Sequence, residues 1–177
     1  ESYNFEVKGS ISMDINDFLY TGKSEIKNDE RVNDILFAVA SLLNFEGGII
    51  AIGILENDKF LEVLKEKKIN FQKINNVFLA IGIENEKKKF KRGWDDLQSY
   101  INNKIMSKIN PSPHGLVKIK IIRNMFEDIS PVIISVGMGN DWHYVENTID
   151  KKSNQQNYEY PRGELFFYRE NNGKKLL

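Results

Sequence analysis

The positions of the apolar residues predict two long helices and several strands. Between residues 31 and 44 the apolar residues recur three, four and seven positions apart, which is the spacing of one face of an α-helix. Gly47-Gly48 interrupts this pattern, and the continuous apolar run at 49–54 is typical of a strand covered on both faces. A second amphipathic pattern over residues 94–109 predicts another helix, which ends before Pro111.

Shorter apolar runs predict the remaining strands. These runs lie at 77–84, 116–122, 131–136 and 165–169. The first of them repeats the Ala-Ile-Gly-Ile of residues 51–54, so we predict that the two copies are neighbours in one sheet. Two copies are too few for a repeat architecture.

The other segments are less regular. Residues 13–20 indicate a short helix with Asp14 as its N-cap. Outside the strand at 77–84, residues 57–91 form an irregular lysine-rich region, and 137–161 form a long polar loop. Together the elements predict an α/β (α+β) fold: a single domain over residues 1–177, with one mixed β-sheet flanked by helices.

Charge and composition exclude several classes of protein. Lys+Arg and Asp+Glu balance at 25 each, so attraction to a polyanion requires a local patch. The chain has no cysteine, which excludes disulfides, thiolate zinc sites and cysteine nucleophiles. No apolar run approaches the ~18 residues of a membrane span, and no signal peptide is visible. We therefore expect a cytoplasmic protein, and the first residue, Glu1, indicates a piece of a longer chain.

Two acids and a lysine are the candidate chemical groups. Glu25 and Lys27 are two residues apart, so on a strand they point to the same face. Glu56 follows the buried strand, and active groups often lie at strand ends. Carboxylate oxygens are ligands suited to Mg²⁺ or Mn²⁺, so Glu25 and Glu56 are candidate metal ligands. The alternative for Glu25 and Lys27 is a surface ion pair.

The same stretch resembles the AlbA-like domain of the Schlafen family, also called the divergent AAA domain. Glu25-Ile26-Lys27 corresponds to the family's E-[FW]-K, and residues 38–56 to its A-F-A-N-T-x-G-G-x-[LI]-x-[IL]-G-[VI]-x-D. Residues 103–113 are similar to its helix ending in I-x-P, and 163–177 to its closing Y-x-R segment. The resemblance covers most of the chain, in order.

This resemblance implies a nucleic-acid-acting domain. The first hypothesis is a metal-dependent endoribonuclease that cleaves tRNA or other structured RNA in a bacterial stress or phage-defence protein. Glu25 and Glu56 would hold Mg²⁺ or Mn²⁺, and Lys27 would stabilise developing negative charge. The second hypothesis is a catalytically degenerate nucleic-acid-binding or sensing module of a transcriptional regulator or defence protein. A purely structural oligomerisation domain is a third alternative.

The chain also departs from the family. Tyr20 occupies the position of a third acid that the nuclease members carry, which favours the binding module. Glu84 follows the second Ala-Ile-Gly-Ile copy and is an alternative to Glu56 as the second acid. The zinc site of other members cannot form here, because the chain has no cysteine.

Two basic segments are candidate nucleic-acid contacts, with RNA the more favoured partner over DNA. The denser one, around Phe90, supplies Lys88, Lys89, Lys91 and Arg92. The second lies in the closing segment and supplies Arg169, Lys174 and Lys175. The alternative for the denser segment is a solvated lysine loop.

The resemblance also bears on assembly. Long Schlafen proteins place two such lobes around a basic groove, and this chain carries one lobe. We therefore predict a homodimer that rebuilds the groove. Residues 165–168 and the loop before them are the predicted contact, because they are apolar and near the terminus. The alternative is that fused domains drive assembly.

Overall fold

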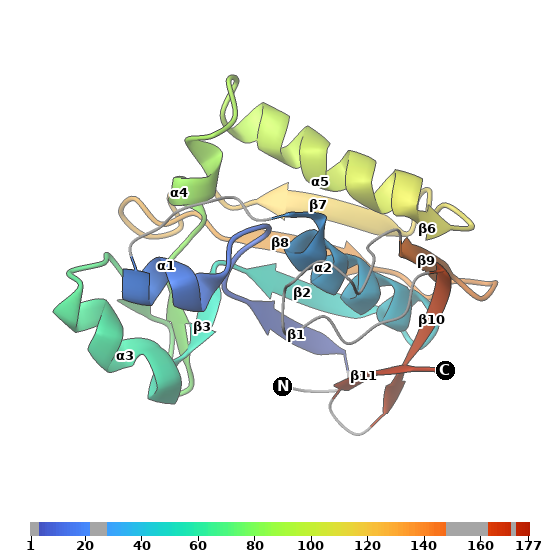
Figure 1. Cartoon of the computed structure of the whole chain (residues 1–177), viewed down its shortest axis with the longest axis horizontal. Coiled ribbons are helices and arrows are strands. Elements are labelled where there is room, and N and C mark those ends of the chain that lie inside the picture. The colour runs from blue at the N-terminus through green and yellow to red at the C-terminus, as the bar shows by residue number, and fades with distance from the viewer. Residues whose placement is uncertain (1–3, 22–27, 148–162, 171–172) are drawn as a thin grey trace.

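A mixed four-stranded sheet forms the centre of the fold. The computed structural model describes residues 4–21, 28–147, 163–170 and 173–177. The strands of this sheet run in the order β1 (Phe5–Lys8), β2 (Gly48–Ile52), β8 (Val132–Val136) and β7 (Val117–Ile121). β1 and β2 are parallel, whereas β8 is antiparallel to β2 and β7, which confirms the predicted mixed sheet (Figure 1).

The other described strands form two further antiparallel sheets, so the prediction of one sheet is corrected. One has the order β11 (Gly173–Leu176), β10 (Gly163–Glu170), β9 (Tyr144–Asn147) and β6 (Ile109–Asn110). The other has the order β3 (Ile54–Glu56), β5 (Phe78–Ala80) and β4 (Gln72–Lys73). The third sheet arises because Gly53 has a φ of 82° and splits the predicted apolar strand into β2 and β3.

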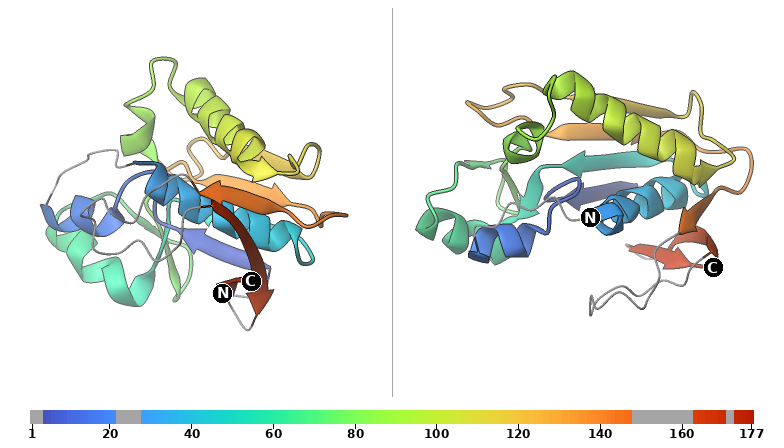
Figure 2. Two further views of the ribbon diagram at one scale, coloured as in Figure 1. Left: turned by 45° about the vertical axis from the view of Figure 1, so that its right-hand side comes forward. Right: turned by 45° about the horizontal axis from the view of Figure 1, so that its top comes forward.

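The two long helices are confirmed as α2 (Asn28–Leu43) and α5 (Trp94–Lys108). α2 packs on the central sheet and also contacts β9 and β10, and α5 lies beside it against β7 (Figure 2). Phe37 of α2 stacks on Phe167 of β10 at a ring-centroid distance of 4.4 Å, inside the main hydrophobic core. The fold is therefore α+β, as predicted. None of the described helices is long and apolar enough to cross a membrane.

Three short helices complete the described elements: α1 (Ile15–Thr21), α3 (Asn57–Glu66) and α4 (Glu84–Lys87). α1 was predicted, and Oδ1 of Asp14 accepts the backbone N–H of Asn16 at 3.0 Å, as expected near a helix N-terminus. α3 was not predicted, although its apolar residues have helical spacing. α1 and α3 pack with β3 and β5 around a separate hydrophobic cluster (Figure 1).

The two Ala-Ile-Gly-Ile segments lie side by side, as predicted. β3 and β5 are antiparallel, with Ile54 opposite Ala80. The carbonyl oxygen of Gly53 accepts the backbone N–H groups of Ile81 and Gly82 at 2.9 and 3.1 Å. A Cβ atom on Gly53 would lie 2.8 Å from the carbonyl carbon of Gly82, so this close approach requires glycine. The close approach of Gly53 and Gly82 lies where the chain leaves β5 and enters α4.

Candidate functional site

The basic turn joins α4 to α5 and presents four exposed cations. These are Lys88, Lys89, Lys91 and Arg92. Phe90 lies between them, and its ring packs against Tyr100 of α5 at 5.4 Å between centroids. Arg92 forms an ion pair with Asp96 at 2.7 Å. The turn is thus attached to α5 at two points while its lysines face solvent.

Residues on both sides of the turn fix its two ends. The Lys87 ammonium lies 4.9 Å from the centre of the Trp94 ring, which is a cation–π arrangement. Gly93 has a φ of 60°, a left-handed conformation that glycine adopts without strain. Lys87 therefore contacts the protein itself through this ring, and it is less exposed than the cations that follow it.

Glu86 anchors α4 in the protein interior. Its carboxylate accepts the backbone N–H groups of Ile11 and Ser12 at 2.9 and 2.7 Å, and the Ser12 hydroxyl at 2.9 Å. The residue is only 1% exposed. Burial raises the pKa of this carboxyl, and the hydrogen bonds from Ile11 and Ser12 oppose that rise. This contact joins the loop before α1 to the helix that carries the basic turn.

The positive charge extends well beyond the basic turn. Residues 87–126 contain ten Lys and Arg residues but only two acids, whereas the whole chain has 25 of each. This segment therefore carries a net charge of +8, and the rest of the chain carries −8. We call the cations after Lys87 in this segment the basic side: the basic turn with Lys104, Lys108, Lys118, Lys120 and Arg123.

The elements that carry these cations are neighbours in the fold. α5 lies against β7, and α4, α5 and β7 follow one edge of the molecule (Figure 1). Lys118 and Lys120 are exposed on the edge strand β7. They alternate with apolar residues that pack toward the core containing α2 and α5, so the two lysines lie on the other face of this strand. Sequence reasoning missed this part of the basic side. The signal that could have found it is the stretch of residues 97–126, which contains no Asp or Glu.

The outer face of α5 adds neutral hydrogen-bonding groups to the basic side. An open polar groove of about 350 Å³ is lined by Asp95, Gln98, Ser99 and Asn102. These residues are three or four positions apart and therefore share one face of the helix. The Gln98 amide also donates to the carbonyl oxygen of Ile119 on β7 at 3.3 Å. Amide and hydroxyl groups in this position can contact sugars and phosphates.

The predicted metal site is only partly visible. Glu25 and Lys27 lie outside the described residues. Glu56 is the last residue of β3 and forms an ion pair with Lys59 of α3. In the described part of the chain, no three His, Asp or Glu side chains are grouped as metal ligands. Tyr20, at the position of the family's third acid, is 62% exposed.

The two alternative acids are not brought together. Glu56 lies opposite Phe78, at the beginning of β5, whereas Glu84 comes after the end of β5. Both carboxylate oxygens of Glu84 are buried, and neither has a hydrogen-bond partner among the described residues. The structure therefore leaves Glu56 as the more accessible of the two, with its side chain 39% exposed.

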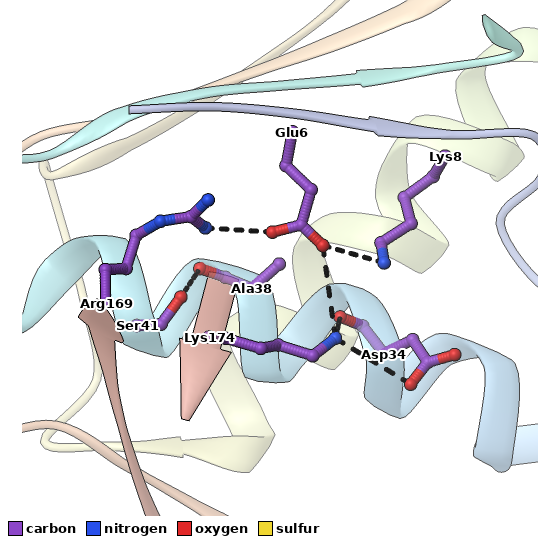
Figure 3. A network of polar contacts seen from close by, with 7 residues as sticks. All are labelled: Glu6, Lys8, Asp34, Ala38, Ser41, Arg169 and Lys174. Atoms are coloured by element: carbon purple, nitrogen blue, oxygen red, sulfur yellow. Dashed lines mark hydrogen bonds and ion pairs between the residues drawn. The ribbon is translucent and has the colours of Figure 1, made fainter. Parts of the chain in front are cut away.

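The closing segment does not form the predicted exposed basic patch. The side chain of Arg169 is 1% exposed, and its Nη1 donates to Oε2 of Glu6 at 2.9 Å (Figure 3). Lys174 is also largely buried: its Nζ donates to the Asp34 carbonyl oxygen at 3.2 Å and lies 4.0 Å from Oε1 of Glu6. Lys8 pairs with the same carboxylate at 2.7 Å.

These five residues form an interior ionic cluster that joins β1, α2, β10 and β11. Two carboxylates, Glu6 and Asp34, face three cations there. Burial lowers the pKa of Lys174 to about 8, with repulsion from Lys8 acting in the same direction. Arg169 and Lys174 thus hold the C-terminal hairpin in place. Of the three cations predicted to form a patch in the closing segment, only Lys175 is exposed.

The predicted dimer contact is also partly corrected. Leu165 and Phe167 point inward and belong to the main core, where Phe167 is fully buried. Alternation along β10 leaves Phe166 and Tyr168 on its other face, where they are half-buried. The sequence of this strand is apolar on both faces, so it did not show which residues would be buried in the core of the same chain and which would lie on the outer face.

Comparison with known proteins yields little. No protein-family model matches the chain, and no curated protein matches it. Among solved structures, it is similar to the DIP2311 protein from Corynebacterium diphtheriae, with a TM-score of 0.48 and 15% sequence identity. The match covers 99% of this chain but only 22% of that one, so the chain spans less than a quarter of that protein's length.

Proposed function

We propose that this chain is a nucleic-acid-binding domain and that the basic side is its binding surface. The observation that carries the proposal is the segregation of charge: a protein with zero net charge has +8 on residues 87–126. Surface cations without a function are usually interspersed with acids. Here Asp95 and Asp96 are the only acids of the segment, and they pair with Arg123 and Arg92.

RNA is the nucleic acid that we favour. Its sugars carry 2′-hydroxyl groups, which donate and accept hydrogen bonds along the minor groove of a duplex. Gln98, Ser99 and Asn102 offer amide and hydroxyl partners for such groups beside the phosphate-binding cations. The phosphates of DNA would bind the cations equally well, but DNA has no 2′-hydroxyl groups to form hydrogen bonds with these neutral side chains.

Salt dependence tests the proposal. If four to seven cations of the basic side contact phosphates, log Kobs should fall with log salt concentration with a slope of about −3 to −6. This slope can be measured by fluorescence anisotropy of a labelled tRNA or RNA duplex, titrated at several salt concentrations from about 50 to about 250 mM. No measurable binding, or a slope near zero, would contradict an electrostatic surface.

Metal-dependent cleavage of RNA is the second candidate function. It is favoured by Glu56, which lies at a strand end with a partly exposed carboxylate, as a metal ligand requires. Glu25 and Lys27 would complete the site, with Mg²⁺ or Mn²⁺ polarising the scissile phosphate. The protein would then be a bacterial defence or stress nuclease, whereas binding alone fits a sensing module or a transcriptional regulator.

Glu25→Gln distinguishes the two functions. In a nuclease this variant should lose at least about two orders of magnitude of cleavage rate, because a metal ligand is removed while the shape is kept. Cleavage of a tRNA pool with Mn²⁺ present is the measurement, and unchanged RNA affinity shows that the variant is folded. Equal cleavage by both proteins would exclude Glu25 from the reaction. Absence of cleavage by the wild type would leave the binding function alone.

A further inference from the structure

The outer face of β9 and β10 carries acids and aromatic rings on the opposite side from the core. Val145 and Leu165 point inward, so Tyr144, Glu146, Glu164 and Phe166 share the outward face. The two glutamates are exposed, and the two rings are half-buried. We call these four residues, with Tyr168, the acidic–aromatic face.

The two glutamates of this face lie directly opposite each other. The register of β9 and β10 pairs Glu146 with Glu164, and neither forms an ion pair with another described residue. Like charges in directly opposed positions of an antiparallel ladder destabilise the pair. Among the described residues no cation offsets this repulsion, and a positively charged group placed between the two carboxylates would remove it.

Aromatic rings adjoin the carboxylates. Tyr144 and Phe166 are the next opposed pair, with their ring centroids 5.2 Å apart, and the Asn110 amide donates to the Tyr144 hydroxyl. Successive outward residues on one strand are about 7 Å apart, so an extended side chain can reach both the rings and the carboxylates. Aromatic faces attract Arg and Lys side chains, and Arg the more strongly because its planar group also stacks.

We propose that the acidic–aromatic face binds a lysine- or arginine-bearing segment of a partner protein. The occupant follows from charge complementarity, since paired carboxylates beside rings favour a cation. A twofold contact between two copies through this face would place four glutamates against one another, so the face is a poor centre for the predicted homodimer. The site is separate from the basic side and does not depend on the proposed function.

A basic peptide tests the proposal directly. The probe is a dye-labelled decapeptide of alternating Arg and Ser, with an alternating Glu and Ser peptide as the negative control. The wild-type chain should bind the Arg peptide saturably at low salt. E146Q/E164Q should weaken this binding about three- to twentyfold, and Phe166→Leu about two- to fivefold. Glu62→Gln with Glu66→Gln, two exposed acids on α3, is the matched control and should leave binding unchanged.

Stability separates a binding role from a structural one. Because E146Q/E164Q removes a repulsion, its free energy of unfolding should equal or exceed that of the wild type. Lower stability would show that the glutamates support the fold and would overturn the proposal. Equal peptide binding by wild type and variant would also overturn it. If the wild type has a mass above 20.5 kDa at low salt and E146Q/E164Q does not, the occupant is a second copy of the chain, and the proposal of a separate partner protein is overturned.

Discussion

Replacing Lys88, Lys89, Lys91 and Arg92 together by glutamine is expected to weaken RNA binding about ten- to a hundredfold near 0.1 M salt. These four side chains are exposed and carry half of the excess charge of residues 87–126. Each lost phosphate contact also reduces counterion release, so the salt slope should become less negative by about 0.7 to 0.9 per contact. Anisotropy titrations at several salt concentrations measure both effects.

A matched control separates the position of the charges from their number. Lys65, Lys67, Lys68 and Lys73 are also exposed, but they lie on or near α3 and β4, away from the basic side. Their replacement by glutamine changes the net charge by the same amount and should alter affinity by less than about threefold. Equal losses in both variants would mean that only net charge matters and that the basic turn has no special role.

Glu6→Gln is expected to have the largest effect on stability. The change leaves Arg169 and Lys174 in the interior with Asp34 as the remaining anion of the described cluster. Breaking a buried ion pair on one side costs about 3–5 kcal/mol, because the remaining charge has no compensation. Urea unfolding measures this loss. Glu62→Gln on the surface of α3 is the control, with an expected change within about 1 kcal/mol.

The same cluster predicts how stability depends on pH. Burial acts to raise the pKa of Glu6, but the charges of Lys8 and Lys174 and the hydrogen bonds from Lys8 and Arg169 outweigh it and lower this pKa. The folded value lies below the ordinary value of 4.5, so this contribution is present above pH 4.5 and is lost as the pH falls through the folded value. Glu6→Gln should reduce this acid dependence.

Lys174 gives a second contribution of the same sign, at alkaline pH. Its pKa of about 8 in the folded chain lies below the ordinary value of 10.5, so the unfolded chain binds more protons between these values. Stability should therefore rise with pH between about 8 and 10.5. Urea unfolding of Lys174→Met over this range should show a smaller rise, and an identical rise in both proteins would exclude Lys174 as its source.

The long elements could be predicted because their information is local. α2 and α5 each have an unbroken helical pattern, and the two Ala-Ile-Gly-Ile segments are similar enough to be paired from sequence. The split at Gly53 was less visible, since an apolar run continues through it. α3 was missed because it lies in a lysine-rich region that was interpreted as irregular, although Phe60, Val63 and Leu64 have helical spacing.

The fate of the charged residues could not be predicted in the same way. Glu6 and Arg169 are 163 positions apart, and their pairing exists only in the fold. Arg169 therefore resembled a surface cation in the sequence, but burial and the carboxylate partner give it an interior role. Likewise, Glu146 and Glu164 become an opposed pair only through the register of β9 and β10. The basic turn could be identified from the sequence because its cations lie close together, interrupted only by Phe90.

Lysine reactivity in the presence and absence of RNA tests the binding surface most directly. The chain is acetylated briefly with and without a saturating tRNA pool, and mass spectrometry gives the modification rate of each lysine. We predict protection of Lys88, Lys89, Lys91, Lys118 and Lys120, with Lys65, Lys67 and Lys68 unprotected as internal controls. Protection confined to the lysines of α3, or equal at all exposed lysines, would contradict a binding surface on the basic side.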